Sequence, residues 1–218
     1  MSQNTYPDTT EAAPDSPGMA GVEVHGLTRS SFILRGALAA GALYGASAVT
    51  PFVSQALAAG GGKDAEILNF ALTLEYLESA FYNVKGREIA LNGQAKSYAR
   101  MFGEQEQDHV QALTAAIKQL GGTPVAKPMF VFPVTNQSTF LALASELENT
   151  GVGAYNGAAP SIESKAVLTS AGSIVQIEAR HAASIDLLIG KSPTPNGGFD
   201  VPLTEAQVLA KVTPLIKK

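Results

Sequence analysis

Two Glu-x-x-His pairs are the residues of this sequence with the clearest chemical potential. Glu106 precedes His109 by three residues, and Glu178 precedes His181 by the same spacing, whereas the third histidine, His25, lies near the N-terminus. Residues i and i+3 share one face of an α-helix, so each pair can converge on a single ion. Carboxylate and imidazole suit iron, manganese or zinc, and the sequence has no cysteine to favour softer metals. The two pairs therefore predict a metal site.

Both pairs lie on seams of otherwise apolar residues, spaced alternately by four and three positions. The seam positions are Phe102, Glu106, His109, Leu113, Ala116 and Leu120 in one segment, and Ile174, Glu178, His181, Ile185 and Leu188 in the other. Burying a carboxylate without a partner costs of the order of several kcal/mol. A bound metal ion is the simplest compensation for these charges. The alternative is a buried network of Glu–His hydrogen bonds without metal.

Two further glutamates repeat the arrangement. Glu75 lies 31 residues before the glutamate of the first pair, and Glu148 lies 30 residues before that of the second. Each is followed seven residues later by a tyrosine, Tyr82 or Tyr155. The chain therefore contains a degenerate tandem repeat of two helix pairs. The four carboxylates, each with charge −1, would be neutralised by two divalent ions.

This pattern resembles the ferritin-like di-iron and di-manganese carboxylate proteins, in which two lone glutamates and two Glu-x-x-His motifs surround the ions. Residues 64–216 also resemble bacterial and fungal ferritin-like domain or desiccation-related proteins. The recognisable pieces are Leu74-Glu75-Tyr76-Leu77-Glu78 with Phe81-Tyr82, Glu106-Gln107-Asp108-His109, Leu147-Glu148 with Ala154-Tyr155, and Glu178-Ala179-Arg180-His181.

The resemblance implies two divalent metal ions, iron or manganese, as cofactors. The ligands it implies are Glu75, Glu106, His109, Glu148, Glu178 and His181, and it leaves open which carboxylates bridge the ions. Tyr82 and Tyr155 are the candidate catalytic residues, because a tyrosine can hydrogen-bond a ligand carboxylate or relay an electron. The alternative for both is core packing with a solvated hydroxyl.

The remaining acids near the motifs rank lower as ligands. Glu78 shares a face with Glu75, but its counterpart in the repeat is Gly151, so we expect a reserve ligand or a residue at the rim of the site. Four other acids are predicted to be surface charges: Glu104, Glu146, Asp108 and Asp186. For the two aspartates, the alternative is a hydrogen bond to a metal-ligating residue.

Four long helices must position these motifs, and their connections predict the topology. Helical periodicity covers residues 64–84, 94–120, 138–158, with Ser138 as the cap, and 164–189, with a last short helix from Thr204. Short connections make the first and second helices, and the third and fourth, antiparallel neighbours. The 17-residue link 121–137 can reach about 56 Å, enough to cross a bundle about 40 Å long. We expect an all-α, ferritin-like four-helix bundle with one long crossover between helices two and three.

The first 62 residues differ from the rest of the chain. Residues 1–26 are polar and lack apolar periodicity, which predicts disorder. A basic segment, 28–35, then precedes the apolar run 36–49 and a small-x-small tripeptide ending at Ala58, as in an export signal. It resembles a twin-arginine leader, although Ser30 stands at the second arginine position, so the general secretory route stays open. An uncleaved membrane anchor is the alternative. The di-metal bundle is expected to comprise residues 63–218.

Composition narrows the function. The 218 residues carry a net charge of −4, which argues against a nucleic-acid partner. We expect an exported, periplasmic or extracellular protein that uses the ions for redox chemistry on Fe(II), oxygen or peroxide in stress protection, like a ferroxidase or manganese catalase. A non-enzymatic, desiccation-related envelope protein with a structural or vestigial metal site is the alternative. Expected partners are Fe(II) or a small-molecule oxidant. Membrane contact would come only through an uncleaved leader, and a homo-oligomer stays open.

Overall fold

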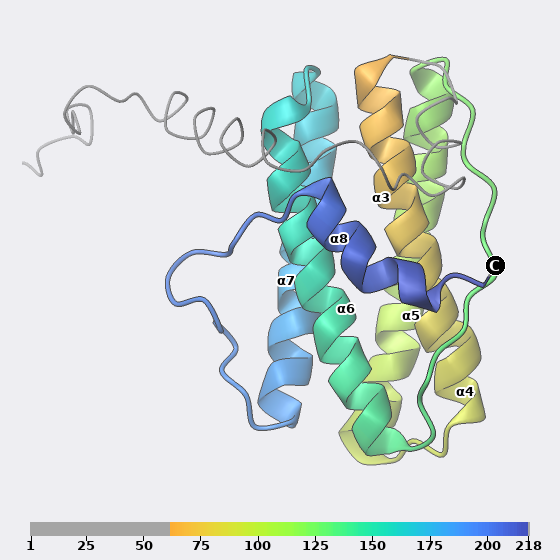
Figure 1. Cartoon of the computed structure of the whole chain (residues 1–218), viewed down its shortest axis with the longest axis vertical. Helices are drawn as coiled ribbons and strands as arrows, with labels where there is room; N and C mark the ends of the chain where they lie inside the picture. The colour runs from red at the N-terminus through yellow and green to blue at the C-terminus, as the bar shows by residue number, and fades with distance from the viewer. Residues whose placement is uncertain (1–61, 218) are drawn as a thin grey trace, which may run out of the picture.

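Four long helices dominate the computed structural model, which describes residues 62–217 (Figure 1). They are α3 (Lys63–Ala80), α5 (Gly93–Gln119), α6 (Gln137–Ala158) and α7 (Lys165–Leu188). Shorter elements are a π-helical segment (Phe81–Lys85), α4 (Gly86–Glu88), α8 (Glu205–Val212) and two 3-10 turns (Ala159–Ser161 and Thr213–Leu215). The all-α fold class is confirmed. The predicted N-terminal leader lies outside the described residues.

The ends of the helices follow local capping chemistry. The predicted cap Ser138 is wrong, because α6 starts one residue after Asn136. The Asn136 side chain accepts a hydrogen bond from the backbone N–H of Thr139, and the Thr139 hydroxyl accepts one from the backbone N–H of Asn136. This reciprocal box satisfies two donors at the start of the helix. Thr204 caps α8 as predicted, and α5 ends where Gly121 adopts a φ of +77°.

The long connection between α5 and α6 runs the length of the bundle (Figure 1). It makes α5 and α6 parallel, while α3 packs antiparallel to α5 and α6 packs antiparallel to α7. Asn69 of α3 holds the start of this crossover, since its amide donates to the carbonyl of Thr123 and accepts from the N–H of Val125. Further along, Phe130 pairs with Ile216 in an antiparallel bridge. The predicted crossover topology is therefore confirmed.

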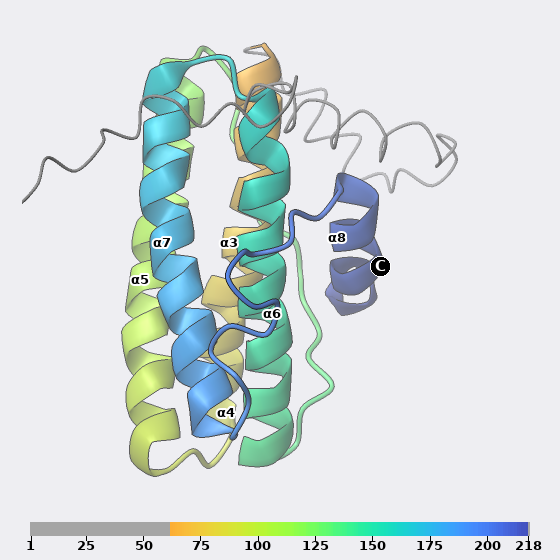
Figure 2. The ribbon, with the colours of Figure 1, turned by 90° about the vertical axis from the view of Figure 1, so that its left-hand side faces the viewer.

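The C-terminal segment covers one face of the bundle. Helix α8 lies across the face formed by α3 and α6, on the side away from α5 and α7 (Figures 1 and 2). Leu203 anchors the preceding loop by donating its N–H to the carbonyl of Gly153 at 2.8 Å. A Cβ atom at Gly157 would overlap the carbonyl oxygen of Leu203, so this close approach requires glycine. Val208 and Val212 of α8 are buried against the bundle.

Two apolar clusters lie along the bundle, one towards each end. One includes Leu77, Phe102 and Phe140, and the other includes Leu68 and Ile117. The predicted metal-ligating residues come from helix turns between these clusters, so apolar side chains close the site above and below. No helix within residues 62–217 combines the length and the apolar composition that a membrane span requires.

Candidate metal centre

The six predicted ligands meet in the interior of the bundle. Helices α3 and α6 contribute one glutamate each, and α5 and α7 contribute a glutamate and a histidine each. The six residues are Glu75, Glu106, His109, Glu148, Glu178 and His181. All four glutamates have a relative exposure of 0%, compared with 8% for His109 and 2% for His181. The structure thus gathers all six side chains in one buried layer.

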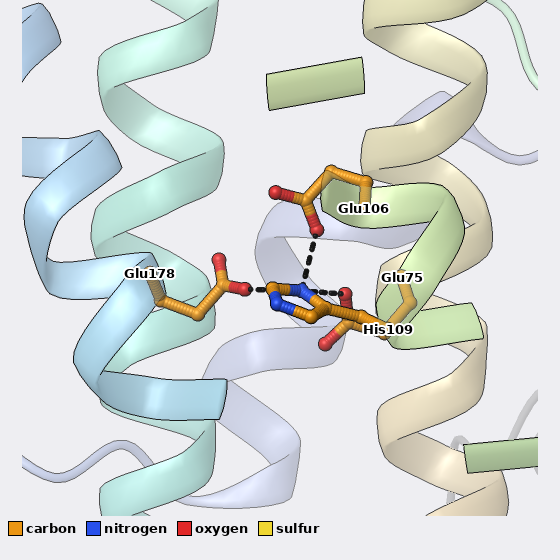
Figure 3. A group of neighbouring side chains, drawn as sticks. All are labelled: Glu75, Glu106, His109 and Glu178. Atoms are coloured by element: carbon orange, nitrogen blue, oxygen red, sulfur yellow. Dashed lines mark hydrogen bonds and ion pairs between the residues drawn. The ribbon is translucent and has the colours of Figure 1, made fainter. Parts of the chain in front are cut away.

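One half of the layer surrounds His109 (Figure 3). Its Nδ1 lies 3.2 Å from Oε2 of Glu75, 3.1 Å from Oε2 of Glu106 and 3.0 Å from Oε1 of Glu178. The carboxylates come from three different helices. One donor atom from each of these four residues lies within 4.8 Å of the others, which is compact enough to hold a metal ion.

The other half surrounds His181. Its Nδ1 lies 2.9 Å from Oε1 of Glu106 and 3.4 Å from Oε2 of Glu148. These residues and Glu178 form a second compact group of four donors. Glu106 and Glu178 therefore belong to both groups. Glu106 turns one oxygen toward each histidine, as a carboxylate shared between two ions would.

The two tyrosines bind carboxylates across the bundle. Tyr82, which lies in the π-helical segment after α3, donates its hydroxyl to Oε1 of Glu148 on α6 at 2.5 Å. Tyr155 of α6 donates to Oε1 of Glu75 on α3, also at 2.5 Å. Each bond occupies one oxygen and leaves the second oxygen facing a histidine. Burial and the adjacent carboxylate raise the pKa of both tyrosines, so both stay protonated donors.

Several buried acceptors in the layer have no hydrogen-bond partner among the described residues. They are Oε2 of Glu78, Oε1 of Glu106, Oε2 of Glu148, Oε2 of Glu178 and Nδ1 of His181, whereas Oε1 of Glu178 has Nδ1 of His109 3.0 Å away. The Nε2 atom of His181 lies 2.7 Å from Oε1 of Gln105, an acceptor, so Nε2 carries the hydrogen. The lone pair of Nδ1 then faces carboxylate oxygens. Lone pairs that converge without a donor are satisfied by a cation, so these residues fit metal ions.

Without metal, the layer retains protons. Burial raises the pKa of Glu106. The hydrogen bond with His109 lowers this pKa, whereas repulsion from Glu75 and Glu148 raises it further. Burial likewise raises the pKa of Glu178, with added repulsion from Glu106 and Glu75. Burial alone would lower the pKa of His109, but its hydrogen bonds to Glu106, Glu178 and Glu75 outweigh this and raise it to about 12.

The metal-free protein is therefore expected to lose stability as the pH rises. A group whose pKa is higher in the folded than in the unfolded state stabilises the fold fully at a pH below its unfolded pKa, which is 4.5 for glutamate and 6.5 for histidine. As the pH rises above that unfolded pKa towards the folded one, this stabilisation is lost. Melting in a chelator should show a melting temperature that falls between pH 5 and pH 9. In Glu106→Gln the decline should be shallower. A melting temperature that rises over this range would contradict the expectation.

Two of the acids that ranked lower as ligands are buried. Glu78 was expected to be a reserve ligand or a rim residue, and it lies buried beside the layer with 2% exposure. Asp186 was expected at the surface, and that expectation is wrong, because its side chain is 1% exposed. It accepts hydrogen bonds from Ser145 at 2.5 Å and from Asn149 at 3.0 Å, both on α6. Glu104, Glu146 and Asp108 are exposed, as predicted.

Two contacts of His181 were missed by the sequence analysis. Gln105 holds its Nε2, and the ring of Phe102 stacks on the imidazole with centroids 3.9 Å apart. Phe102 was assigned only to the apolar seam. Gln105 has no polar counterpart in the second repeat, where Ile177 precedes the glutamate, so the repeat gave no signal for it.

Comparison with known proteins was made for the whole sequence and for the fold. A family model described as "Ferritin-like domain" matches residues 63–191. Among solved structures, one titled as ferritin-like, diiron-carboxylate proteins from Bacillus anthracis str. Ames is similar, with 23% sequence identity and a TM-score of 0.52. The match covers 65% of this chain and 100% of that chain, and at this identity it supports the fold alone. Comparison with curated proteins gives no match.

Proposed function

The chain belongs to the ferritin-like domain family, and we propose that it binds two divalent ions, iron or manganese, between α3, α5, α6 and α7. The observation that carries this proposal is the set of buried acceptors around His181, where Nδ1 faces Oε1 of Glu106 and Oε2 of Glu148 with no hydrogen-bond donor among the described residues. Glu106 and Glu178 would be shared by both ions. Glu75 and His109 would serve one ion, and Glu148 and His181 the other.

The chain's own residues would fix the shape of such a centre. Gln105 holds His181 with Nδ1 directed inward, and Phe102 limits the tilt of its ring. Tyr82 and Tyr155 restrain one oxygen each of Glu148 and Glu75, which is the basis for proposing them as the catalytic tyrosines. The bound ions would supply one-electron chemistry for Fe(II), oxygen or peroxide.

We also propose that the protein works outside the cytoplasm, in the periplasm or the extracellular space, in protection against stress. The support is the pattern of basic segment, apolar run and small-x-small tripeptide in residues 28–58. Fe(II) or a small-molecule oxidant would be the partner in this setting.

A second candidate is a non-enzymatic stress-related or desiccation-related protein with a structural metal site. The burial of the centre favours it, because all four glutamates have 0% exposure and only His109, at 8%, reaches the surface to any extent.

Metal analysis tests the proposal directly. Full-length protein purified without chelator should contain about two iron or manganese ions per chain by mass spectrometry. The redox function then predicts consumption of peroxide or oxidation of Fe(II) by the loaded protein, whereas the structural candidate predicts bound metal without turnover. Protein that stays metal-free after anaerobic loading with Fe(II) and Mn(II) would contradict both.

A further inference from the structure

Glu78 is a fifth buried carboxylate beside the four of the metal layer. It lies on α3 one turn after Glu75 and is 2% exposed. Its Oε2 atom has no hydrogen-bond partner, and no lysine, arginine or histidine among residues 62–217 forms an ion pair with it. A buried carboxylate without hydrogen bond or counter-ion is strongly disfavoured, so Glu78 either keeps a proton, as its raised pKa indicates, or binds a cation that the rest of the described chain does not supply.

A glycine on the facing helix creates the space for Glu78. A Cβ atom at Gly151 of α6 would lie 3.3 Å from Oε1 of Glu78 and 3.3 Å from Oε2 of Glu178. The two carboxylates therefore flank the same point, and a larger side chain would push them apart. Gly151 occupies the repeat position that corresponds to Glu78. One half of the repeat thus contributes the carboxylate, and the other half contributes its space.

The neighbours of Glu78 on α6 indicate the half of the layer to which it belongs. Gly151 follows Glu148 by three residues and shares its face of α6, so a side chain in contact with Gly151 also lies near Glu148. The repulsion exerted on Glu78 agrees with this placement, because it is larger from Glu178 and Glu148 than from Glu75 of its own helix. Among residues 62–217 the remaining buried acids are Asp64, which accepts from the backbone N–H of Glu163, and Asp186, which accepts from Ser145, and neither belongs to a donor group.

We propose that Glu78 is an additional ligand of the ion held by Glu148 and His181, and that it makes the two ion positions unequal in affinity. The inference rests on the proposed dinuclear centre. The ion beside His109 would then face Glu75 and the two shared carboxylates. The ion beside His181 would face Glu148, the same two shared carboxylates and Glu78, which is one negative charge more. A divalent ion binds more tightly where an extra carboxylate compensates it, so the His181 position fills first.

Titration of metal-free, full-length protein with Mn²⁺ alone, followed by calorimetry, tests this assignment. The wild type should bind two ions in two resolved steps. Glu78→Gln, which keeps the shape of the side chain and removes its charge, should weaken the tighter step at least about tenfold and leave the other within about twofold. Gly151→Ala should weaken the same step through Glu78 and also the other step through the shared Glu178, because its methyl group would lie 3.3 Å from an oxygen of each. Glu104→Gln, an exposed acid on α5, should titrate like the wild type.

A double-mutant comparison identifies the half of the site. If Glu78 and Glu148 bind the same ion, Glu78→Gln and Glu148→Gln should weaken the same Mn²⁺ binding step, and their effects on its affinity should be non-additive. Glu75→Gln should instead weaken the other binding step. Two Mn²⁺ bound with unchanged affinities in Glu78→Gln and Gly151→Ala would overturn the inference and leave the dinuclear centre standing. Equal weakening of both steps in Glu78→Gln would also overturn it. A wild type that binds no Mn²⁺ would overturn the centre itself.

Discussion

Replacing Glu106 with alanine is expected to abolish the binding of both ions, whereas Glu75→Ala should remove only one. Glu106 Oε2 lies 3.1 Å from Nδ1 of His109 and its Oε1 lies 2.9 Å from Nδ1 of His181. Both compact donor groups lose a member when Glu106 is shortened, but only one contains Glu75. Metal content by mass spectrometry should fall from about two ions per chain to near zero in Glu106→Ala, and to about one in Glu75→Ala.

The comparison needs a variant that disturbs α5 without touching the layer. Glu104→Ala serves, because Glu104 is exposed two residues before Glu106 on the same helix. Its metal content should equal that of the wild type. Circular dichroism should show that all three variants keep their helices. If Glu106→Ala retained one tightly bound ion, Glu106 would not be shared between the two positions.

Metal loading is expected to raise the melting temperature by roughly 10–20 °C. Each ion at about one hundred times its dissociation constant stabilises the folded state by about 2.7 kcal/mol, and two such ions contribute about twice that. For a chain of this size, 1 kcal/mol corresponds to roughly 2–4 °C. Differential scanning calorimetry of the chelator-treated and the Mn²⁺-loaded protein measures the difference. A melting temperature that does not change on loading would mean that the ions do not bind the folded layer.

In the same experiment, Glu178→Gln should raise the melting temperature of the metal-free protein but reduce the increase that metal loading causes. Burial and the repulsion from Glu106 and Glu75 raise the pKa of Glu178 and outweigh the hydrogen bond with His109, so its charge destabilises the metal-free fold. The neutral amide should therefore raise the melting temperature of the metal-free protein by a few degrees, and it should lose most of the gain on loading. Glu104→Gln should leave both temperatures unchanged. A lower melting temperature for metal-free Glu178→Gln would show that this carboxylate supports the fold through His109.

The helices and their topology could be predicted because they depend on local properties of the chain. Apolar periodicity marks a helix wherever one face is buried, and the reach of the 17-residue link is set by covalent geometry. The N-cap of α6 was misplaced by two residues, at Ser138 instead of Asn136, because both side chains can cap a helix and only the reciprocal bond with Thr139 distinguishes them. The π-helical segment around Tyr82 has no local signature that this sequence displays.

The candidate site was predictable to the extent that it follows the helix period. Seam positions and the internal repeat were enough to select the six side chains that the structure brings together. The exact position of Glu78 could not be predicted, because it depends on space on another helix. That space exists because Gly151 of α6 has no side chain. Likewise, the burial of Asp186 depends on Ser145 and Asn149, which pack against it from α6. Such contacts between helices have no trace in the spacing of either helix alone.

The crossed tyrosine bonds have a consequence for how the protein could be taken apart. Tyr82 from the first half holds Glu148 of the second, and Tyr155 from the second half holds Glu75 of the first. If the backbone were cut within the crossover, each fragment would keep half of the donors and lack the clamp for its own lone glutamate. Reassociation of the fragments would rebuild both clamps and both donor groups together. The split chain would then behave as a two-part system, and metal binding would drive the reassembly of its fragments.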